Sequence, residues 1–370
     1  MNKKSIIYIA PLPPPHMGPS IATQIILNSR YVNEFHVVHI DTGDRRPLNN
    51  IGRLDVINVF LALKHYFLLF IKLLSIRAAL VYVPISQQAL GFLRDVPFIF
   101  ISKFFRKKVL LHLRGGNFRE FYVSSDIIMK FLIEKTLKKV DGMIVLGHSL
   151  KPLFYGLIPE KKLLVVPNGL DISFNGHRKN VSSPKQFTIL FLSNFIASKG
   201  YWDVLNSIKK VVEFQKNVRF LFAGSWLDIR DRLRCREFIQ RQGLADYVEF
   251  MPAVKGEEKI KLLMVADVFV FPTYYPFEGH PWVIVEAMAA ALPIITTNQG
   301  CIKETVIDGK NGFIIPKKDP DAIAEKIICF ITHPELRETM GNMSRKLYEE
   351  NFTEKHFVQR MIDATYCILQ

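Results

Sequence analysis

Residues 274–298, YYPFEGHPWVIVEAMAAALPIITTN, decide the fold class of this chain. They follow a short apolar run, Val268–Phe271, whose length and composition are typical of a buried strand. Prolines and a glycine then interrupt the pattern before residues 282–291, an apolar run that predicts a helix. A strand, a loop and a helix in this order predict a parallel α/β sheet, with the loop at the carboxyl edge where ligands bind.

Two carboxylates flank the start of this predicted helix. Glu278 lies in the loop and Glu286 in the second turn, eight residues apart. The first turn of a helix offers unpaired N–H groups and a positive dipole end, which suit an anion. Glutamates in such places are often only solvated, but the residues around Glu286 are apolar, and a carboxylate buried there needs a hydrogen-bond partner. The pattern predicts a phosphate site between two hydroxyl-binding carboxylates, as a sugar nucleotide would require.

Length and composition predict two globular domains. The chain has 370 residues, of which 49% are hydrophobic, enough for two separate cores. Its four cysteines all fall in the second half without a CxxC pair, so they indicate neither a zinc site nor a disulfide framework, and they favour a reducing compartment. The first apolar run, Ser5–Ala10, is too short for a signal peptide and predicts a strand. We therefore expect a cytoplasmic protein.

The positive charge is concentrated in the first half. Residues 1–170 carry 23 lysines and arginines against 10 aspartates and glutamates, a net charge of +13, whereas residues 171–370 have a net charge of +2. This asymmetry indicates attraction to a polyanion, either an anionic membrane face or nucleic acid, or only a soluble basic surface.

Two apolar segments of the first half bear on membrane association. Residues 56–74 are interrupted by Lys64, His65 and Lys72, so we reject a transmembrane helix and expect a helix that packs in a core or lies at an interface. Residues 98–108 mix aromatic with basic side chains, a pattern that suits an anionic bilayer but also ordinary helix packing.

Strands and helices alternate along both halves, which predicts two doubly wound parallel sheets. The polar, aperiodic residues 171–186 mark the boundary between them. We expect a first domain over residues 1–170, a second over 171–353 and a final helix over 354–370. Expected strands cover the following residues: 4–10, 35–40, 109–113, 143–146, 163–166, 187–192, 218–222, 247–251 and 267–271.

Small and polar residues follow several of these strands. Gly18 lies where a loop meets a predicted helix over residues 21–32, which allows close backbone approach to a ligand. Arg114 follows the strand ending at residue 113, and Gly224 follows the one ending near residue 222. Lys199 precedes a glycine that opens a helix.

Four motifs in order resemble the family 4 glycosyltransferases of the GT-B fold. They are the spacing of Glu278 and Glu286, the Lys199-Gly200 pair after a strand, VPNGLD at residues 166–171 and DGKNGF at residues 308–313. The resemblance implies two Rossmann-like domains facing across a cleft, with the nucleotide-sugar held mostly by the second domain, the acceptor by the first, and a final helix crossing back to the first.

The resemblance also implies roles for individual residues. Glu278 would contact hydroxyls of the donor sugar, and Glu286 would bind the ribose. Main-chain groups around Gly279 and His280, followed by Pro281 and Trp282 at the helix start, would hold the sugar and diphosphate together with Lys199. A lysine and a helix N-terminus can offset the charge of a leaving diphosphate, so we expect no metal ion and no other cofactor.

Three positions depart from the family pattern. Family members often have an arginine after the first strand of the second domain, where this chain has Asn194. Many have a histidine and a glycine where this chain has Arg114 and Gly115, so we assign Arg114 rather than His112 to the site. Pro281 removes one N–H group from the loop.

The resemblance therefore implies a retaining hexosyltransferase that uses a UDP- or GDP-sugar. We expect a glycan or polyprenyl-diphosphate-linked acceptor at the inner face of a plasma membrane with an anionic surface, as in capsule, O-antigen or lipopolysaccharide synthesis. The alternatives are a non-hydrolysing sugar-nucleotide epimerase and a catalytically silent scaffold or nucleic-acid binder. No nucleic-acid partner is expected, because the basic half lacks an aromatic base-stacking motif.

Overall fold

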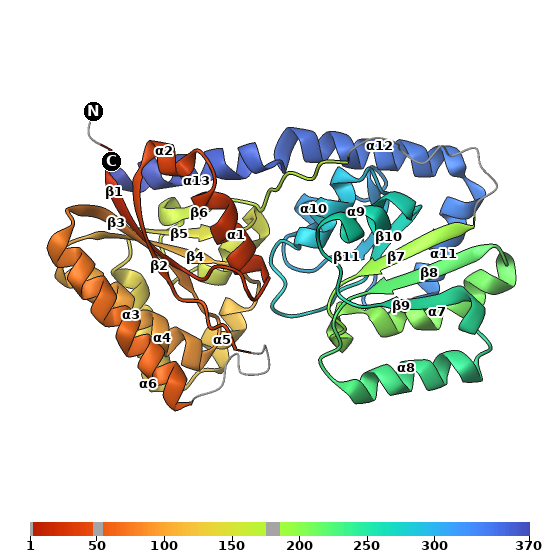
Figure 1. Cartoon of the computed structure of the whole chain (residues 1–370), viewed down its shortest axis with the longest axis horizontal. Helices are drawn as coiled ribbons and strands as arrows, with labels where there is room; N and C mark the ends of the chain where they lie inside the picture. Colours follow the sequence, from red (N-terminus) through yellow and green to blue (C-terminus); the bar gives the residue numbers. More distant parts are fainter. Residues whose placement is uncertain (1–2, 47–54, 175–185) are drawn as a thin grey trace. The chain divides into compact units, whose positions relative to one another are not determined.

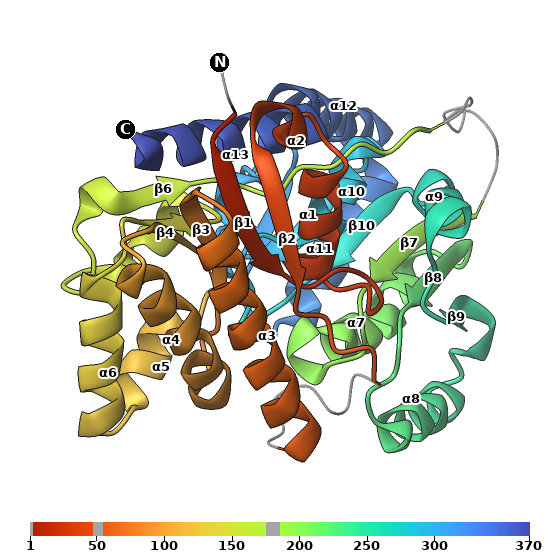
Figure 2. The ribbon, with the colours of Figure 1, turned by 60° about the vertical axis from the view of Figure 1, so that its left-hand side comes forward.

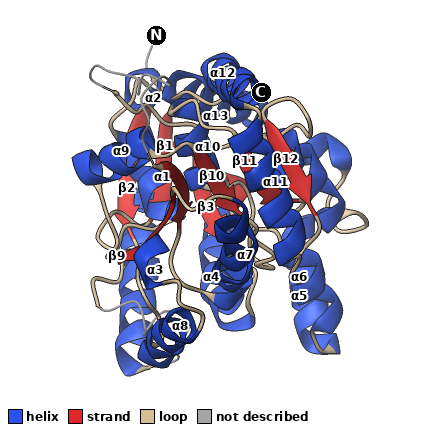
Figure 3. Ribbon diagram, turned by 90° about the vertical axis from the view of Figure 1, so that its right-hand side faces the viewer, coloured by secondary structure: helices blue, strands red, loops and turns tan. Residues whose placement is uncertain are grey.

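The computed structural model describes residues 3–46, 55–174 and 186–370, and the chain forms two compact α/β units. The first unit comprises Met1–Gly169 together with Glu354–Gln370, and the second comprises Leu170–Thr353. Each unit is built on a six-stranded parallel sheet, and Figure 3 shows the strands inside and the helices outside. The predicted pair of doubly wound sheets is confirmed.

The first sheet has the strand order β2-β1-β3-β4-β5-β6. Its strands are β1 (Ser5–Ala10), β2 (His36–Asp41), β3 (Ala78–Ile85), β4 (Lys108–Leu113), β5 (Gly142–Val145) and β6 (Leu163–Val165). Nearly every residue of β1, β3, β4 and β5 is buried. This is expected of central parallel strands, because helices cover both faces.

Helices cover the first sheet on both faces (Figures 1 and 2). One face carries α1 (Gly18–Leu27), α2 (Tyr31–Glu34) and the C-terminal α13 (Glu354–Leu369). The hydroxyl of Tyr31 lies 2.8 Å from that of Thr365, which ties α13 to this unit. The other face carries α3 (Val56–Ser75), α4 (Ala89–Phe104), α5 (Phe118–Ser124) and α6 (Ile127–Lys138).

The second sheet has the order β12-β11-β10-β7-β8-β9. Its strands are β7 (Phe187–Leu192), β8 (Val218–Ala223), β9 (Val248–Met251), β10 (Val268–Phe271), β11 (Ile294–Thr297) and β12 (Gly312–Ile315). Its helices are α7 (Tyr201–Phe214), α8 (Ile229–Arg241), α9 (Gly256–Val265), α10 (Trp282–Ala289), α11 (Pro320–Thr332) and α12 (Pro334–Asn351). The strands β8 and β9 follow on one side of β7 and the strands β10 to β12 on the other, so the strand order reverses between the parallel strands β7 and β10, and the loops after these two strands meet at the carboxyl edge.

The structure adds three strands that the sequence did not predict, β3, β11 and β12. The single helix expected over residues 21–32 is wrong, because the chain forms α1 and then the short α2. The expected linker over residues 171–186 lies mostly outside the described residues, which resume at residue 186.

Helix α3 departs from the expectation of a core helix. It is the one helix, among the described residues, that is long and apolar enough to cross a membrane, with a mean hydropathy of 1.7 over its 18-residue window. Only 17% of that window is buried, so most of this apolar helix faces outward. The core alternative is therefore wrong.

Candidate active site

The loop between β10 and α10 carries two buried carboxylates. Glu278 is 8% exposed and Glu286 is 6% exposed, so neither is a merely solvated surface group. Pro281 occupies the N-cap of α10 with φ −66°, a value that its ring favours, and Trp282 begins the helix half-buried. Glu286 follows in the second turn, as its spacing predicted. A buried carboxylate needs a partner, and each of these has a lysine.

Lys199 is the partner of Glu278. It ends a short 3-10 helix, η4 (Ala197–Lys199), after β7, and its ammonium group forms an ion pair with Glu278 Oε2. The hydroxyl of Thr273 donates to the same oxygen over 3.2 Å. The ammonium also lies 4.6 Å from the ring centroid of Tyr275, a cation–π distance. Burial raises the pKa of Tyr275, and the Glu278 carboxylate raises it further.

Backbone contacts hold the two loops together. The amide of Tyr274 donates to the carbonyl of Ser198 over 2.8 Å. Gly200 has φ +85°, and a Cβ atom there would lie 2.5 Å from the carbonyl oxygen of Pro272, so only glycine fits beside Lys199. These contacts fix the lysine against the loop that carries its partner.

A third loop, after β11, supports the far side of Glu278. The amide of Cys301 donates to the carbonyl of Gly279 over 3.0 Å. Gly300 has φ +59°, and a Cβ atom there would lie 2.4 Å from that same carbonyl. The backbone carbonyl of Gly279 is thus engaged within the protein.

His280 points into the interior of the unit. It is 3% exposed, its Nε2 lies 2.8 Å from the hydroxyl of Thr305, and its ring centroid lies 5.3 Å from that of Phe352. Its imidazole therefore has a packing role in this structure. The main-chain role implied by the resemblance stays a prediction.

Glu286 has one paired and one unpaired carboxylate oxygen. Its Oε1 accepts from Lys259 Nζ on α9 over 2.7 Å. Its Oε2 is buried and has no hydrogen-bond partner among the described residues. Burying a carboxylate oxygen without a hydrogen-bond partner costs free energy, unless an additional donor reaches it, for example a hydroxyl of a bound molecule.

Asn194 and Gly224 lie at the ends of β7 and β8. Asn194 is exposed, and its Oδ1 accepts weakly from the amide of Ser225 over 3.4 Å. A Cβ atom at Gly224 would lie 1.9 Å from the carbonyl oxygen of Ser193, so no side chain fits there. Glycine at 224 therefore lets the two loops approach closely.

In the first unit, Arg114 follows β4 at the carboxyl edge, and His112 is fully buried within the strand. Arg114 donates to Oδ1 of Asn168, in the VPNGLD motif. Burial lowers the pKa of Arg114, and burial together with the neighbouring arginine holds the pKa of His112 well below its usual value. His112 is therefore neutral near pH 7, with Nδ1 2.8 Å from the hydroxyl of Tyr82.

Gly18 is the first residue of α1, directly after the loop that leaves β1. It thus lies at the carboxyl edge of the first sheet, like Arg114. Among the residues described, no group of three histidines, cysteines, aspartates or glutamates could hold a metal ion.

The sequence of the second unit matches a known domain family. Residues 174–347 match the family model for glycosyl transferases group 1. The capsular polysaccharide biosynthesis glycosyltransferase CapM of Staphylococcus aureus is 32% identical over 178 residues, 46% of this chain and 43% of CapM. Spore coat protein SA of Bacillus subtilis is 32% identical over 180 residues, 48% of each chain. This chain thus spans about half the length of the curated relatives it matches.

The fold of the whole chain matches a solved structure. HepE of Anabaena, crystallised in complex with UDP, superposes with a TM-score of 0.73 at 16% identity, covering 98% of this chain and 99% of HepE. This similarity shows that the chain has the GT-B fold. The cleft implied by the resemblance stays a prediction.

Three residues of the site escaped the sequence analysis. Thr273 and Tyr275 lie at the start of the loop, and a polar residue two positions after a buried strand was an available signal for Thr273. Lys259 lies 27 positions before Glu286 on another helix, and nothing in its local sequence distinguishes it from the other lysines of that segment.

Proposed function

We propose that this protein is a glycosyltransferase that moves a sugar from a UDP- or GDP-sugar to a glycan acceptor. The proposal rests on the ion pair between Lys199 and Glu278, which joins the loop after β7 to the loop that precedes α10. A cation and a hydroxyl-binding carboxylate, brought together from two loops at the carboxyl edge of a parallel sheet, suit a sugar diphosphate. The family match over the same residues supports this assignment.

The roles follow from charge and position. Lys199 and the N-terminus of α10 offset the charge that develops on the leaving diphosphate, so that no metal ion is needed. Glu278 orients hydroxyls of the sugar, and the unpartnered oxygen of Glu286 accepts from a ribose hydroxyl. The acceptor attacks from the face that the diphosphate leaves, which retains the anomeric configuration, and the departing phosphate takes up its proton.

The acceptor side rests on the first unit. Its basic surface suits a polyprenyl-diphosphate-linked glycan, which we place at the cytoplasmic face of the plasma membrane. Arg114, half-buried at the carboxyl edge and held by Asn168, is the residue that we assign to an anionic or polar group there. CapM, a relative named for capsular polysaccharide biosynthesis, supports a role in surface polysaccharide assembly.

The test is a panel of UDP- and GDP-sugars incubated with and without a lipid-linked glycan extract. A transferase releases UDP or GDP only when acceptor is present, and it retains its activity in EDTA. An epimerase would instead convert the sugar without acceptor and without nucleotide release. Turnover without acceptor dependence, or loss of turnover in EDTA, would contradict the corresponding part of the proposal.

A further inference from the structure

Helix α3 presents an apolar stripe to the outside of the first unit. Leu69, Leu73 and the imidazole of His65 form the buried side of the helix. The opposite side carries large apolar side chains spaced at three and four residues, a helical period that puts them on one face. This outer stripe consists of Val56, Phe60, Leu63, Phe67, Phe70, Ile71 and Leu74, which are 40–85% exposed.

Such a face is unusual for a helix that covers a sheet. The outward side of such a helix is normally polar, with the apolar stripe directed to the core. In α3 the outward side carries the large apolar side chains. Single exposed apolar residues are common on protein surfaces, but here they form a continuous stripe along a helix of 20 residues. A surface of this kind marks an interaction site.

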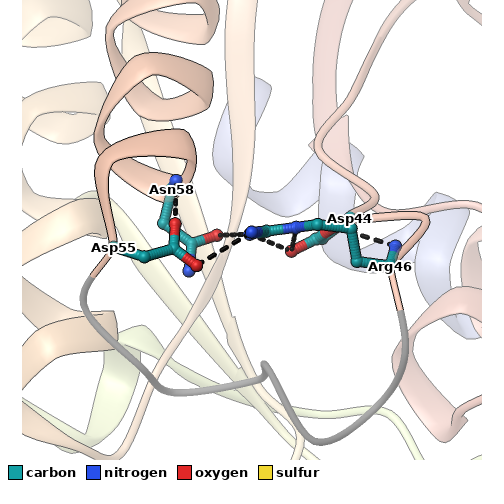
Figure 4. A network of polar contacts seen from close by, with 4 residues as sticks. All are labelled: Asp44, Arg46, Asp55 and Asn58. Carbon is teal, nitrogen blue, oxygen red and sulfur yellow. Dashed lines mark hydrogen bonds and ion pairs between the residues drawn. The ribbon is translucent and has the colours of Figure 1, made fainter.

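The helix is anchored as a surface element. Asp55 caps its N-terminus by accepting from the amide of Asn58 over 2.6 Å, and Arg46 bridges Asp55 to Asp44 (Figure 4). Along its length, the hydroxyl of Tyr66 donates to the carbonyl of Arg94 on α4 over 2.7 Å. Crossing a membrane would break these contacts, so the helix lies along the protein surface.

The neighbouring helices add both apolar and basic groups. Helices α3, α4 and α6 lie side by side on one face of the sheet (Figure 2). Exposed apolar side chains continue in the first turns of α4 and α6, at Leu90, Leu93, Ile127, Ile128 and Phe131. Residues 56–139, which include these helices, carry fourteen lysines and arginines against four aspartates and glutamates, a net charge of +10.

We infer that the outer stripe of α3, with the first turns of α4 and α6, docks onto an anionic bilayer surface. An apolar helix face among basic side chains suits the headgroup region, where the apolar face enters and the cations meet anionic lipids. A second copy of this chain would bring the same positive charge against itself, so the charge favours lipid over self-association. The first turns of these helices lie at the carboxyl edge of the sheet, the edge that carries Arg114. Docking would thus hold this edge near a lipid-linked acceptor, so the inference deepens the proposed function.

The experiment measures binding of the full chain to vesicles, without turnover, so its failure is distinguishable from failure of the proposed transferase. Vesicles of phosphatidylcholine with about one-third phosphatidylglycerol are compared with pure phosphatidylcholine at low and high salt. The variant Phe60→Glu/Phe67→Glu is expected to weaken binding by at least about tenfold. Lys64→Gln, an exposed lysine of α3 beside the outer stripe, is expected to weaken binding to anionic vesicles by up to about fivefold at low salt.

The control is Leu233→Glu on α8, an arginine-rich helix of the second unit, which should leave binding unchanged; this leucine is 52% exposed, against 67% for Phe60 and 64% for Phe67. Far-UV circular dichroism and UDP binding report whether each variant folds. Phe67→Trp gives a second readout, with a blue shift and quenching by brominated lipid on docking. Four results would overturn the inference. They are equal binding to neutral vesicles, wild-type binding by the double glutamate variant, a dimer that this variant dissociates without any vesicle binding, and resistance to alkaline extraction.

Discussion

Lys199 and Glu278, 79 positions apart in the chain, form an ion pair between the loops that follow β7 and β10. Their side chains are only 14% and 9% exposed, so water screens the pair weakly. Each group would be left as an uncompensated buried charge without the other. The side chains that we assign to the diphosphate and to the sugar therefore also stabilise the loop that presents them.

This pairing predicts strong coupling between the two positions. Lys199→Met and Glu278→Gln should each lower the free energy of unfolding. The loss in the double variant should be smaller than the sum of the two single losses, by a coupling energy of about 0.5–3 kcal/mol. Urea denaturation of the wild type, the two single variants and the double variant measures this coupling energy. Additive changes would show that the pair contributes little to stability.

Glu278→Gln should separate the chemical role from the structural one. Glutamine keeps the size of the side chain and can accept from Lys199 and Thr273, so the variant should still fold, with the loss of stability that removal of the ion pair brings. If the carboxylate orients the sugar, the transfer rate should fall by about 10²-fold or more. Glu257→Gln, on the exposed side of α9, is the matched control and should retain full activity. Wild-type turnover by Glu278→Gln would remove this residue from the mechanism.

The unpartnered oxygen of Glu286 predicts discrimination between nucleotides. Wild-type protein should bind UDP more tightly than 2′,3′-dideoxy-UDP, because only the ribose supplies hydroxyl donors to that oxygen. In Glu286→Gln the ratio of the two dissociation constants should shrink by about tenfold. Isothermal titration with both ligands measures it, with Lys259→Met as a second variant that leaves the carboxylate in place. If the ratio of the two dissociation constants is the same in Glu286→Gln as in wild type, the ribose does not bind at Glu286.

The strand–loop–helix order around Glu278 could be predicted from the sequence because it depends on local signals. Apolar runs of strand length, prolines in the loop and the apolar helix each leave a pattern within a few residues. The strand over residues 187–192 was predicted to the residue for the same reason, and the final helix, expected over residues 354–370, forms over residues 354–369. Strand β3 was missed, although its eight residues are mostly buried, because it directly follows the long apolar helix α3 and the two runs merge.

Contacts across the sheet could not be predicted in this way. Lys259 reaches Glu286 from a different helix, α9, and the burial of Glu278 depends on a third loop at Gly300. The inward orientation of His280 likewise depends on Thr305, 25 residues further along. The outer stripe of α3 was visible as an apolar segment, but only the structure shows that it faces away from the core.

The cap of α3 predicts a difference between two similar aspartates. Asp55 accepts from the amide of Asn58 and pairs with Arg46, whereas Asp126 caps α6 by accepting from Met129 over 2.8 Å. Loss of an N-cap leaves an amide at the helix start without its hydrogen-bond partner. Asp55→Ala should therefore lower the melting temperature, and Asp126→Ala should lower it by less than Asp55→Ala. Thermal unfolding of the two variants gives the comparison, and equal losses would show that the Arg46 network contributes nothing.

Asp203, in the first turn of α7, predicts a pH dependence of stability. Its burial raises its pKa to about 6, against the opposing effect of Lys318, and its Oδ2 has no hydrogen-bond partner among the described residues. Because this pKa exceeds the unfolded value of about 3.9, the folded state binds the proton more tightly, and stability falls as pH rises from about 4 to 6. Asp203→Asn should match wild type near pH 4 and melt a few degrees higher above pH 6. The control is Asp321→Asn at an exposed position, and this variant should not melt higher than wild type above pH 6. If the melting temperatures of Asp203→Asn and wild type change with pH in parallel, the burial of Asp203 does not destabilise the protein.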